Sequence, residues 1–363
     1  MESRKVQKVG YSTLTVSLPS EWAKRNNINP GDLIFIMQER DGTLKIMPGH
    51  VARREEAEEH IINADACNEK GMLERIIVGS YILGRDVIKI ISSKRIEKSY
   101  VEEVRGIVQK LIGLGILEET QNSILLQCSI DPTKFKLDML MRRLAIIAST
   151  MLSEVTQALV EGNKELANEA MRREEEADKI YYLSVRLLLL AQLKPEVAEN
   201  VGVTEIIFIP ATRLILQFLE MIADYCEDLA KKVLAFTTYR NKVSDETIKD
   251  IAHLGDLTQA IFQKAVDCLF SRDLKIANGI LEMHKLLYEK VDRLMTELPE
   301  IPYLRAMISS LNKIADLGAS IAEIAINRSL EKPDKDVEEI VKTIKHVRTV
   351  PLLAEKRHES ILR

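Results

Sequence analysis

An internal repeat in the second half of the chain limits its possible folds more than any other feature. Residues 158–171 (ALVEGNKELANEAM) align with residues 268–281 (CLFSRDLKIANGIL), and residues 219–234 (LEMIADYCEDLAKKVL) align with residues 311–326 (LNKIADLGASIAEIAI). A period of about one hundred residues is typical of one supersecondary unit used twice. Apolar residues at helical spacing fill both copies. The sequence therefore predicts two tandem three-helix bundles.

Capping and stop signals divide this region into six helices. Gly162-Asn163 is a typical C-cap pair, Pro195 stops the second helix, and Ser244 can cap the fourth. The aromatic content of 5% also favours helices packed by aliphatic side chains. The expected helices are 137–161, 164–193, 204–237, 244–270, 273–298 and 301–330.

The first fifty residues have a different pattern. Short β-branched runs at 4–9 and 13–18 flank Gly10, and two further strands meet around Asp41-Gly42, a strong hairpin signal. A unit of this size with such short strands buries little surface, because small domains are poor in core. We therefore expect this unit to form a homodimer.

The chain is expected to contain four parts. Residues 1–50 form the strand-rich module and 51–134 a small α/β connector, with the order strand, helix, strand, helix, strand, strand. Residues 135–331 form the six-helix domain, with repeats at about 135–238 and 243–331, and 332–363 form a helical tail. The connector has no phosphate-binding loop, and its sequence does not indicate its role.

Charge and hydropathy exclude some functions. With a net charge of −4, no global basic field attracts nucleic acid, so any DNA contact needs a local patch. The four cysteines are too far apart for a zinc site or a disulfide framework. The first residues do not resemble a signal peptide, and the apolar stretches 180–193 and 203–223 are short or interrupted by charges. We expect a cytoplasmic protein without membrane insertion.

Residues 4–48 resemble the AbrB/SpoVT swapped-hairpin module. The matching features are a basic first strand, a Gly turn at Gly10, a strand ending at Leu18-Pro19, a short helix with Trp22, and the Gly31-Asp32 turn. The resemblance implies an intertwined homodimeric β barrel whose basic strand lies against DNA.

The resemblance assigns DNA contacts to Arg4, Lys5 and Lys8, with Ser12 and Thr13 near the turn. Residues 1–26 hold five basic and two acidic side chains, a local excess of three positive charges that a dimer would double. Such contacts give affinity that falls with salt. The alternative is that these charges form a solvated strand edge, which discourages aggregation.

Residues 136–330 resemble the PhoU family, whose fold is two tandem three-helix bundles with Glu/Asp-x-x-x-Asp motifs. The first bundle has two such motifs, Glu174-x-x-x-Asp178 and Glu220-x-x-x-Asp224. The family is known for metal ions or clusters at these motifs, so these four acids are the implied ligands.

The spacing of these acids suits a cation. Residues four apart lie on one helix face, and two helices with such pairs can bring four carboxylates together. Oxygen ligands suit Mg²⁺ or Ca²⁺, and iron or zinc remain possible. Glu174 lies in a charged run that is also typical of a solvated face. Glu220 and Asp224 lie in an apolar stretch, where charges must be paired, hydrated or metal-bound.

The second bundle departs from the pattern. Its motif positions read Tyr288-x-x-x-Asp292 and Asn312-x-x-x-Asp316. Only Asp292 and Asp316 are acids, although Glu289 and His284 lie near them in sequence. A weaker site, a site for another metal, or the loss of the site would follow, and we favour a lost or weakened site.

A module of the AbrB type ahead of a PhoU-like half is similar to archaeal phosphate-uptake regulators. Carboxylate-bridged diiron enzymes need two Glu-x-x-His motifs, and only Glu355-x-x-His358 occurs, so we do not expect an enzyme. The resemblance implies a DNA-binding regulator of phosphate uptake. The alternative is an adaptor that docks on a transporter ATPase subunit or a signalling protein, with the first module as a dimerisation clasp.

Overall fold

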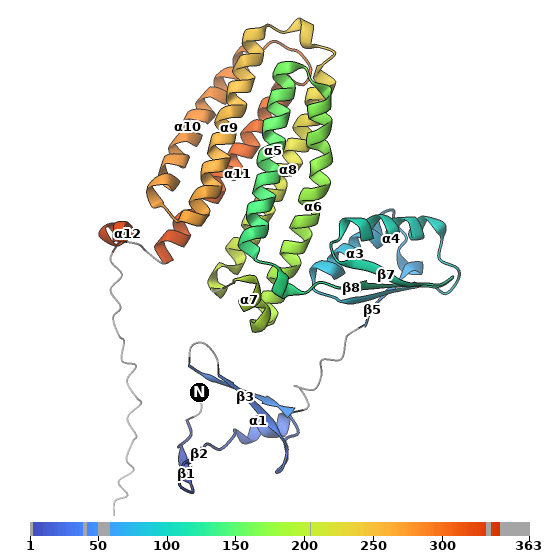
Figure 1. Ribbon diagram of the computed structural model, residues 1–363, viewed down its shortest axis with the longest axis vertical. Helices are drawn as coiled ribbons and strands as arrows, with labels where there is room; N and C mark the ends of the chain where they lie inside the picture. Colours follow the sequence, from blue (N-terminus) through green and yellow to red (C-terminus); the bar gives the residue numbers. More distant parts are fainter. Residues whose placement is uncertain (1–2, 39–41, 50–58, 204, 332–334, 342–363) are drawn as a thin grey trace, which may run out of the picture. The chain divides into compact units, whose positions relative to one another are not determined.

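The computed structural model describes residues 3–38, 42–49, 59–203, 205–331 and 335–341 (Figure 1). The chain divides into two compact units, Met1–His60 and Ile61–Arg363. Most of the predicted tail, including Glu355 and His358, lies outside the described residues; within it, α12 spans Lys335–Ile340.

The first unit consists of two β-hairpins and a short helix. The strands are β1 (Gln7–Val9), β2 (Thr13–Thr15), β3 (Ile34–Gln38) and β4 (Leu44–Pro48), and α1 spans Ser20–Arg25. β1 pairs with β2 and β3 with β4, both antiparallel. Gly10 turns the first hairpin with φ of 67°, a conformation that suits glycine. The predicted hairpins are confirmed, but in the described part of one chain they form two separate sheets and no closed barrel.

The first unit has almost no core of its own. Among its described residues only Pro48 is buried. Large apolar side chains are exposed on both hairpins, including Leu14 at 69%, Leu33 at 75% and Ile36 at 59%. Isolated hairpins are marginally stable at best in water, so this unit needs a partner surface over these side chains.

A four-stranded sheet opens the second unit. Its elements are β5 (Glu59–Asn63), α3 (Met72–Ile82), β6 (Val87–Ile91), α4 (Lys98–Lys110), β7 (Leu114–Glu119) and β8 (Ser123–Cys128). The strand order is β5-β6-β8-β7, and the helices α3 and α4 pack side by side on the sheet (Figure 1). The order of elements predicted for the connector is confirmed. Leu73, Ile77, Ile88 and Leu126 are fully buried in its core.

The rest of the second unit is two three-helix bundles. They consist of α5 (Leu137–Glu161), α6 (Lys164–Leu193), α8 (Ile209–Phe236), α9 (Asp245–Ser271), α10 (Leu274–Glu297) and α11 (Leu304–Glu331). The first three helices pack together, as do the last three, and the bundles meet where α8 contacts α11 and α5 contacts α9 (Figure 1). Asn163, Ser244 and Asp273 cap α6, α9 and α10 through their side chains.

The third helix begins later than predicted. Residues 204–237 were expected to be one helix, but α8 begins at Ile209, and the short helix α7 (Pro195–Val201), which the sequence analysis did not predict, precedes it. Gly202 ends α7 with φ of 84°, and Pro210 occupies the first turn of α8. Both residues suit these positions, because glycine tolerates positive φ and proline lacks the N–H that a first turn leaves unused.

Of the described helices, α5 alone is long and apolar enough to cross a membrane by length and composition. The sequence predicted a helix over the same residues, 137–161. Leu144, Ala148, Met151 and Val155 are fully buried within the bundle core. Its apolar character is therefore explained by packing against α6, α8 and α9.

Candidate metal centre and basic strand

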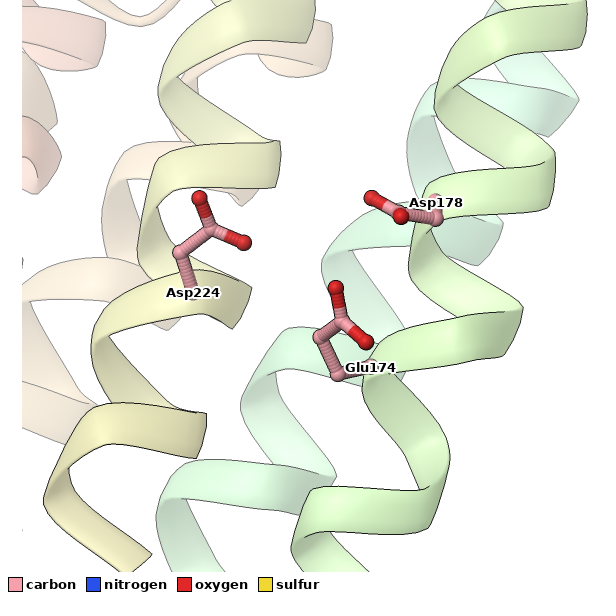
Figure 2. Close-up of side chains that lie close together, drawn as sticks. All are labelled: Glu174, Asp178 and Asp224. Carbon is pink, nitrogen blue, oxygen red and sulfur yellow. The ribbon is translucent and has the colours of Figure 1, made fainter. Parts of the chain in front are cut away.

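Three carboxylates of the first bundle converge between α6 and α8. One oxygen from each of Glu174, Asp178 and Asp224 lies within 4.8 Å of the others. Figure 2 shows Glu174 and Asp178 on α6 pointing towards Asp224 on the facing helix α8. The predicted i, i+4 spacing places the two α6 acids on one face, and the packing of α6 against α8 brings the third acid opposite them.

Buried neighbours fix the directions of these acids. Ala177 and Ile180 on α6, and Ala223 and Cys226 on α8, are fully or nearly fully buried in the bundle core. The acids lie beside these residues in sequence, so they lie at the edge of that core. Glu174 and Asp178 are partly buried, and Asp224 is the most exposed of the three.

Glu220 lies one turn before Asp224 but is held by another side chain. Its Oε2 accepts a hydrogen bond from Gln217 Nε2 at 2.7 Å. Gln217 Oε1 in turn accepts from the Tyr181 hydroxyl at 2.7 Å, and Arg213 Nη2 donates to that hydroxyl at 3.0 Å. Glu220 is therefore an oriented carboxylate beside the three-acid cluster.

All four carboxyl groups are harder to ionise than usual. Burial, and then the charge of Asp178, raises the pKa of Glu174 to about 7. Burial, and then the charge of Asp224, raises the pKa of Glu220 to about 7. Burial and the charge of Asp178 raise the pKa of Asp224 to about 6, and burial raises the pKa of Asp178. Desolvation and like charges both disfavour ionised acids, so the cluster is electrostatically strained when ionised.

Among the described residues, Lys110, Arg213 and Lys231 relieve this strain only in part, because the pKa values stay raised. Lys110 on α4 lowers the pKa of Glu174 and Asp178, but its Nζ also lies 3.8 Å from Glu74. Lys231 pairs with Glu227 at 2.6 Å. An all-oxygen cluster with excess negative charge fits a hard cation such as Mg²⁺ or Ca²⁺, and carboxylates also bind iron and zinc.

The second bundle does not assemble an equivalent set of acids. Asp316 Oδ1 lies 2.7 Å from His284 Nε2, and Asp316 Oδ2 accepts from Asn312 Nδ2 at 3.3 Å. Asp292 is exposed, and among the described residues the only cluster of three potential metal ligands is in the first bundle.

The motif assignment in α10 was one turn out of register. The repeat aligns Ala158 with Cys268, and the same spacing carries Glu174 onto His284 and not onto Tyr288. The structure agrees, because His284 contacts Asp316 as Glu174 approaches Asp224. Asp292 is thus a turn beyond the motif, and Asp316 is partnered by neutral or weakly basic groups instead of acids.

The predicted DNA-contacting residues lie on the first hairpin. Arg4 and Lys5 precede β1, Lys8 lies within it opposite Leu14, Ser12 is in the turn, and Thr13 begins β2. All five predicted side chains are exposed in the single chain.

Sequence reasoning missed the residues that support the acids. Gln217 is three residues before Glu220 and therefore on the same helical face, a spacing that could have indicated the hydrogen bond. Lys110 had no such signal, because it comes from the α/β part of the unit and reaches the cluster only through tertiary packing.

Parts of the chain are similar to known protein families. Residues 141–233, which include all four acids of the first bundle, match the model of the PhoU domain. This stretch is similar to the PhoU domain. Residues 7–54 match the model described as antidote-toxin recognition MazE, bacterial antitoxin, so a MazE/AbrB-like stretch precedes the PhoU-like one.

Two known proteins are matched over most of their own length. The chain is 25% identical over 185 residues to a phosphate-specific transport system accessory protein PhoU homologue of Zymomonas mobilis subsp. mobilis, covering 48% of this chain and 75% of that protein. The crystal structure of PhoU from Pseudomonas aeruginosa is 15% identical with a TM-score of 0.43, covering 54% of this chain and 96% of that one.

Proposed function

We propose that this protein is a DNA-binding transcriptional regulator of phosphate uptake, with a metal-binding sensor in its helical half. The observation that carries the proposal is the presence, in one chain, of a PhoU domain and a MazE/AbrB-like module with an exposed basic strand. The phosphate-specific transport name of the Zymomonas relative supports the phosphate connection. We give the protein no catalytic role and expect it in the cytoplasm.

In this proposal the active form is a homodimer. The apolar side chains exposed on both hairpins of the first unit are the surface that a second copy would cover. Closure of the two copies into one barrel would also remove the free strand edges. The dimer doubles the basic strand, so two equivalent cationic surfaces would meet the DNA.

The basic strand would supply affinity through phosphate contacts. Arg4, Lys5 and Lys8 provide the charge, and Ser12 and Thr13 provide hydroxyl donors to phosphate oxygens. Each neutralised phosphate releases counterions, so the logarithm of the binding constant should fall by about 0.9 per contact for each unit of log salt.

The acidic cluster would hold the metal. Glu174, Asp178 and Asp224 would bind it directly, with Glu220 beside them. Mg²⁺, Ca²⁺, iron or zinc would each neutralise the excess negative charge, and the ion would join α6 to α8. Whether the ion is bound between α6 and α8 is the signal that the helical half would pass to the DNA-binding dimer.

The decisive experiment is a fluorescence-anisotropy titration of the full chain against DNA from upstream of the phosphate-transporter operon, at two salt concentrations. Replacing Arg4, Lys5 and Lys8 by Ala should weaken binding at least tenfold and flatten the salt dependence. The matched control replaces Lys94, Arg95 and Lys98 by Ala. These exposed side chains of the α/β part carry the same total charge, and their loss should change the DNA affinity little.

Two results would reject the proposal. One is the absence of specific binding by the wild-type protein. The other is equal loss of binding in the triple variant and its control, since only non-specific attraction depends on net charge alone. Capture of a transporter ATPase subunit together with absent DNA affinity would instead support the adaptor function, with the first unit as a dimerisation clasp.

A further inference from the structure

A small polar cavity lies at one end of the helical domain, and none of the acidic-motif residues lines it. Its volume is about 90 Å³, several times what one water molecule needs and enough for a tetrahedral oxyanion. The beginnings of α5 and α8 and the ends of α9 and α11 all contribute to its wall. The cavity therefore adjoins helices of both bundles.

Arg328, near the end of α11, brings a partly buried guanidinium to this cavity. Its Nε and Nη1 are inaccessible to solvent and make no hydrogen bond, and no ion pair joins it to another described residue. Its nearest aromatic contact is the ring of Phe208, 5.6 Å away. Burial, and then the charge of Arg272, lowers the pKa of Arg328. An unsatisfied buried N–H costs free energy that an acceptor in the cavity would recover.

Further donors border the same space. Arg272 ends α9 in the left-handed conformation, with φ of 60°, and lines the cavity with the Thr212 hydroxyl. Neither α5 nor α8 has a side-chain cap at its N-terminus, so the first N–H groups of both helices lack this partner. Two guanidinium groups, a hydroxyl and two helix N-termini together favour a bound anion.

Acceptors are present as well. The carboxylates of Glu205 and Asp138 line the cavity, and both act on Arg328 electrostatically. A carboxylate offers about four acceptor positions, so each can accept a bond from a ligand in addition to its protein contacts. A fully deprotonated anion would meet repulsion from these groups, whereas an anion that carries a proton can donate to them.

We propose that this cavity binds a protonated inorganic oxyanion, with Arg328, Arg272 and Thr212 donating to its oxygens and Glu205 accepting a hydrogen bond from its protonated oxygen. Hydrogen phosphate has this chemistry at neutral pH, whereas sulfate has no proton to donate. The choice of phosphate among such anions rests on the proposed function; the binding of a protonated oxyanion does not. An occupied site would bridge the ends of the two bundles.

The test is calorimetric titration of the chelator-treated full chain with sodium phosphate and, at matched ionic strength, sodium sulfate. Chelation removes metal, so that phosphate cannot bind through an ion at the acidic cluster. Phosphate should give saturable heat and sulfate none. Arg328→Met should weaken phosphate binding about 10- to 100-fold, because it removes charge-assisted hydrogen bonds. Arg293→Met, an exposed arginine of α10, is the matched control and should leave the affinity unchanged.

Two further measurements distinguish a ligand-binding role of Arg328 from a purely structural one: the melting temperature of the variants and their preference for phosphate over sulfate. Without phosphate, Arg328→Met should melt at the same temperature as the wild type or higher, since it removes a desolvated charge. Glu205→Gln should reduce the preference for phosphate over sulfate. Absent phosphate binding, equal binding of sulfate, or an unchanged affinity in Arg328→Met would overturn the proposal. Operator binding, measured in phosphate-free buffer, tests the proposed function separately, and its failure would leave this site intact.

Discussion

Arg186 of α6 donates a hydrogen bond from Nη1 to the carbonyl oxygen of Tyr81, 2.5 Å away at the end of α3. The same nitrogen reaches the carbonyl oxygen of Arg85 at 3.1 Å, and Nη2 donates to Asp86. The side chain is 1% exposed. A helix end leaves its last carbonyls without intrahelical partners, and here one of them accepts from both the Gly84 N–H, at 3.0 Å, and a buried guanidinium. These hydrogen bonds connect the α/β part to α6, the helix that carries two of the clustered acids.

Arg186→Met should lower the free energy of unfolding by about 1–3 kcal/mol, because the carbonyls of Tyr81 and Arg85 each lose a hydrogen bond from a charged donor. Asp86 is 68% exposed and would remain hydrated, so its lost ion pair contributes little. Urea unfolding measures the change. Arg105→Met is the control: its pair with Glu119 is at the surface and should contribute about 0–1 kcal/mol. Equal effects of the two substitutions would contradict the role of Arg186 in stabilising the contact between the α/β part and α6.

Metal content should depend on the three convergent acids. Asp178→Asn and Asp224→Asn should each reduce the metal bound to the purified protein, because each removes a charged oxygen ligand. Gln217→Leu should weaken metal binding by about tenfold, since it releases Glu220 from its orienting hydrogen bond. Elemental analysis by mass spectrometry measures the ion. Asp292→Asn, outside the cluster, should have no effect, and unchanged metal in both cluster variants would refute the assignment.

The metal-free protein should lose stability as the pH rises. The pKa values of Glu174 and Glu220 are raised from 4.5 to about 7, and that of Asp224 from 3.8 to about 6. The folded chain therefore keeps protons that the unfolded chain releases near pH 4, and stability falls between about pH 4 and pH 7. Urea unfolding of chelator-treated protein at pH 5 and pH 8 measures this loss.

The double variant Glu174→Gln/Asp224→Asn isolates the contribution of the cluster. It should show a smaller loss between the two pH values than the wild type, because two of the strained ionisations are removed. Added metal should reverse the trend in the wild type, since the ion binds the ionised acids. An identical pH dependence in variant and wild type would exclude the cluster as the source.

Local signals predicted the bundle helices well. The bounds of α5 and α6 agree with the prediction, because Gly162, Asn163 and Pro195 are unambiguous stop and start signals. The predicted start of α8 was too early. The apolar residues before Pro210 continue the helical pattern, and the break is visible only when Gly202 is recognised as the C-cap of α7. Apolar periodicity alone cannot locate such a break.

The candidate site was predicted in outline but not in its partners. Spacing on one helix put Glu174 and Asp178 on one face, and the resemblance to the PhoU family implied the facing helix. The hydrogen bond that holds Glu220 depends on rotamers of Gln217, and the approach of Lys110 depends on packing between distant segments. Neither can be read from spacing. The register error at Asp292 arose from matching an acid motif where the repeat itself pointed to His284.

The close contact between α5 and α9, at the boundary of the two bundles, can be tested by substitution. Gly255 of α9 faces Thr156 of α5 so closely that an added Cβ would lie 2.8 Å from its Oγ1 and 2.9 Å from its Cγ2. Gly255→Ala should therefore destabilise the protein by about 1–3 kcal/mol, because the β-branched threonine cannot move away without shifting its helix. Gly279→Ala in α10 meets nothing within 4 Å and should stabilise by about 0.5–1 kcal/mol through helix propensity. Thermal and urea unfolding of both variants compare them directly. If both substitutions stabilised the protein, α5 and α9 would not approach as closely as described, and the packing of the two bundles would need another arrangement.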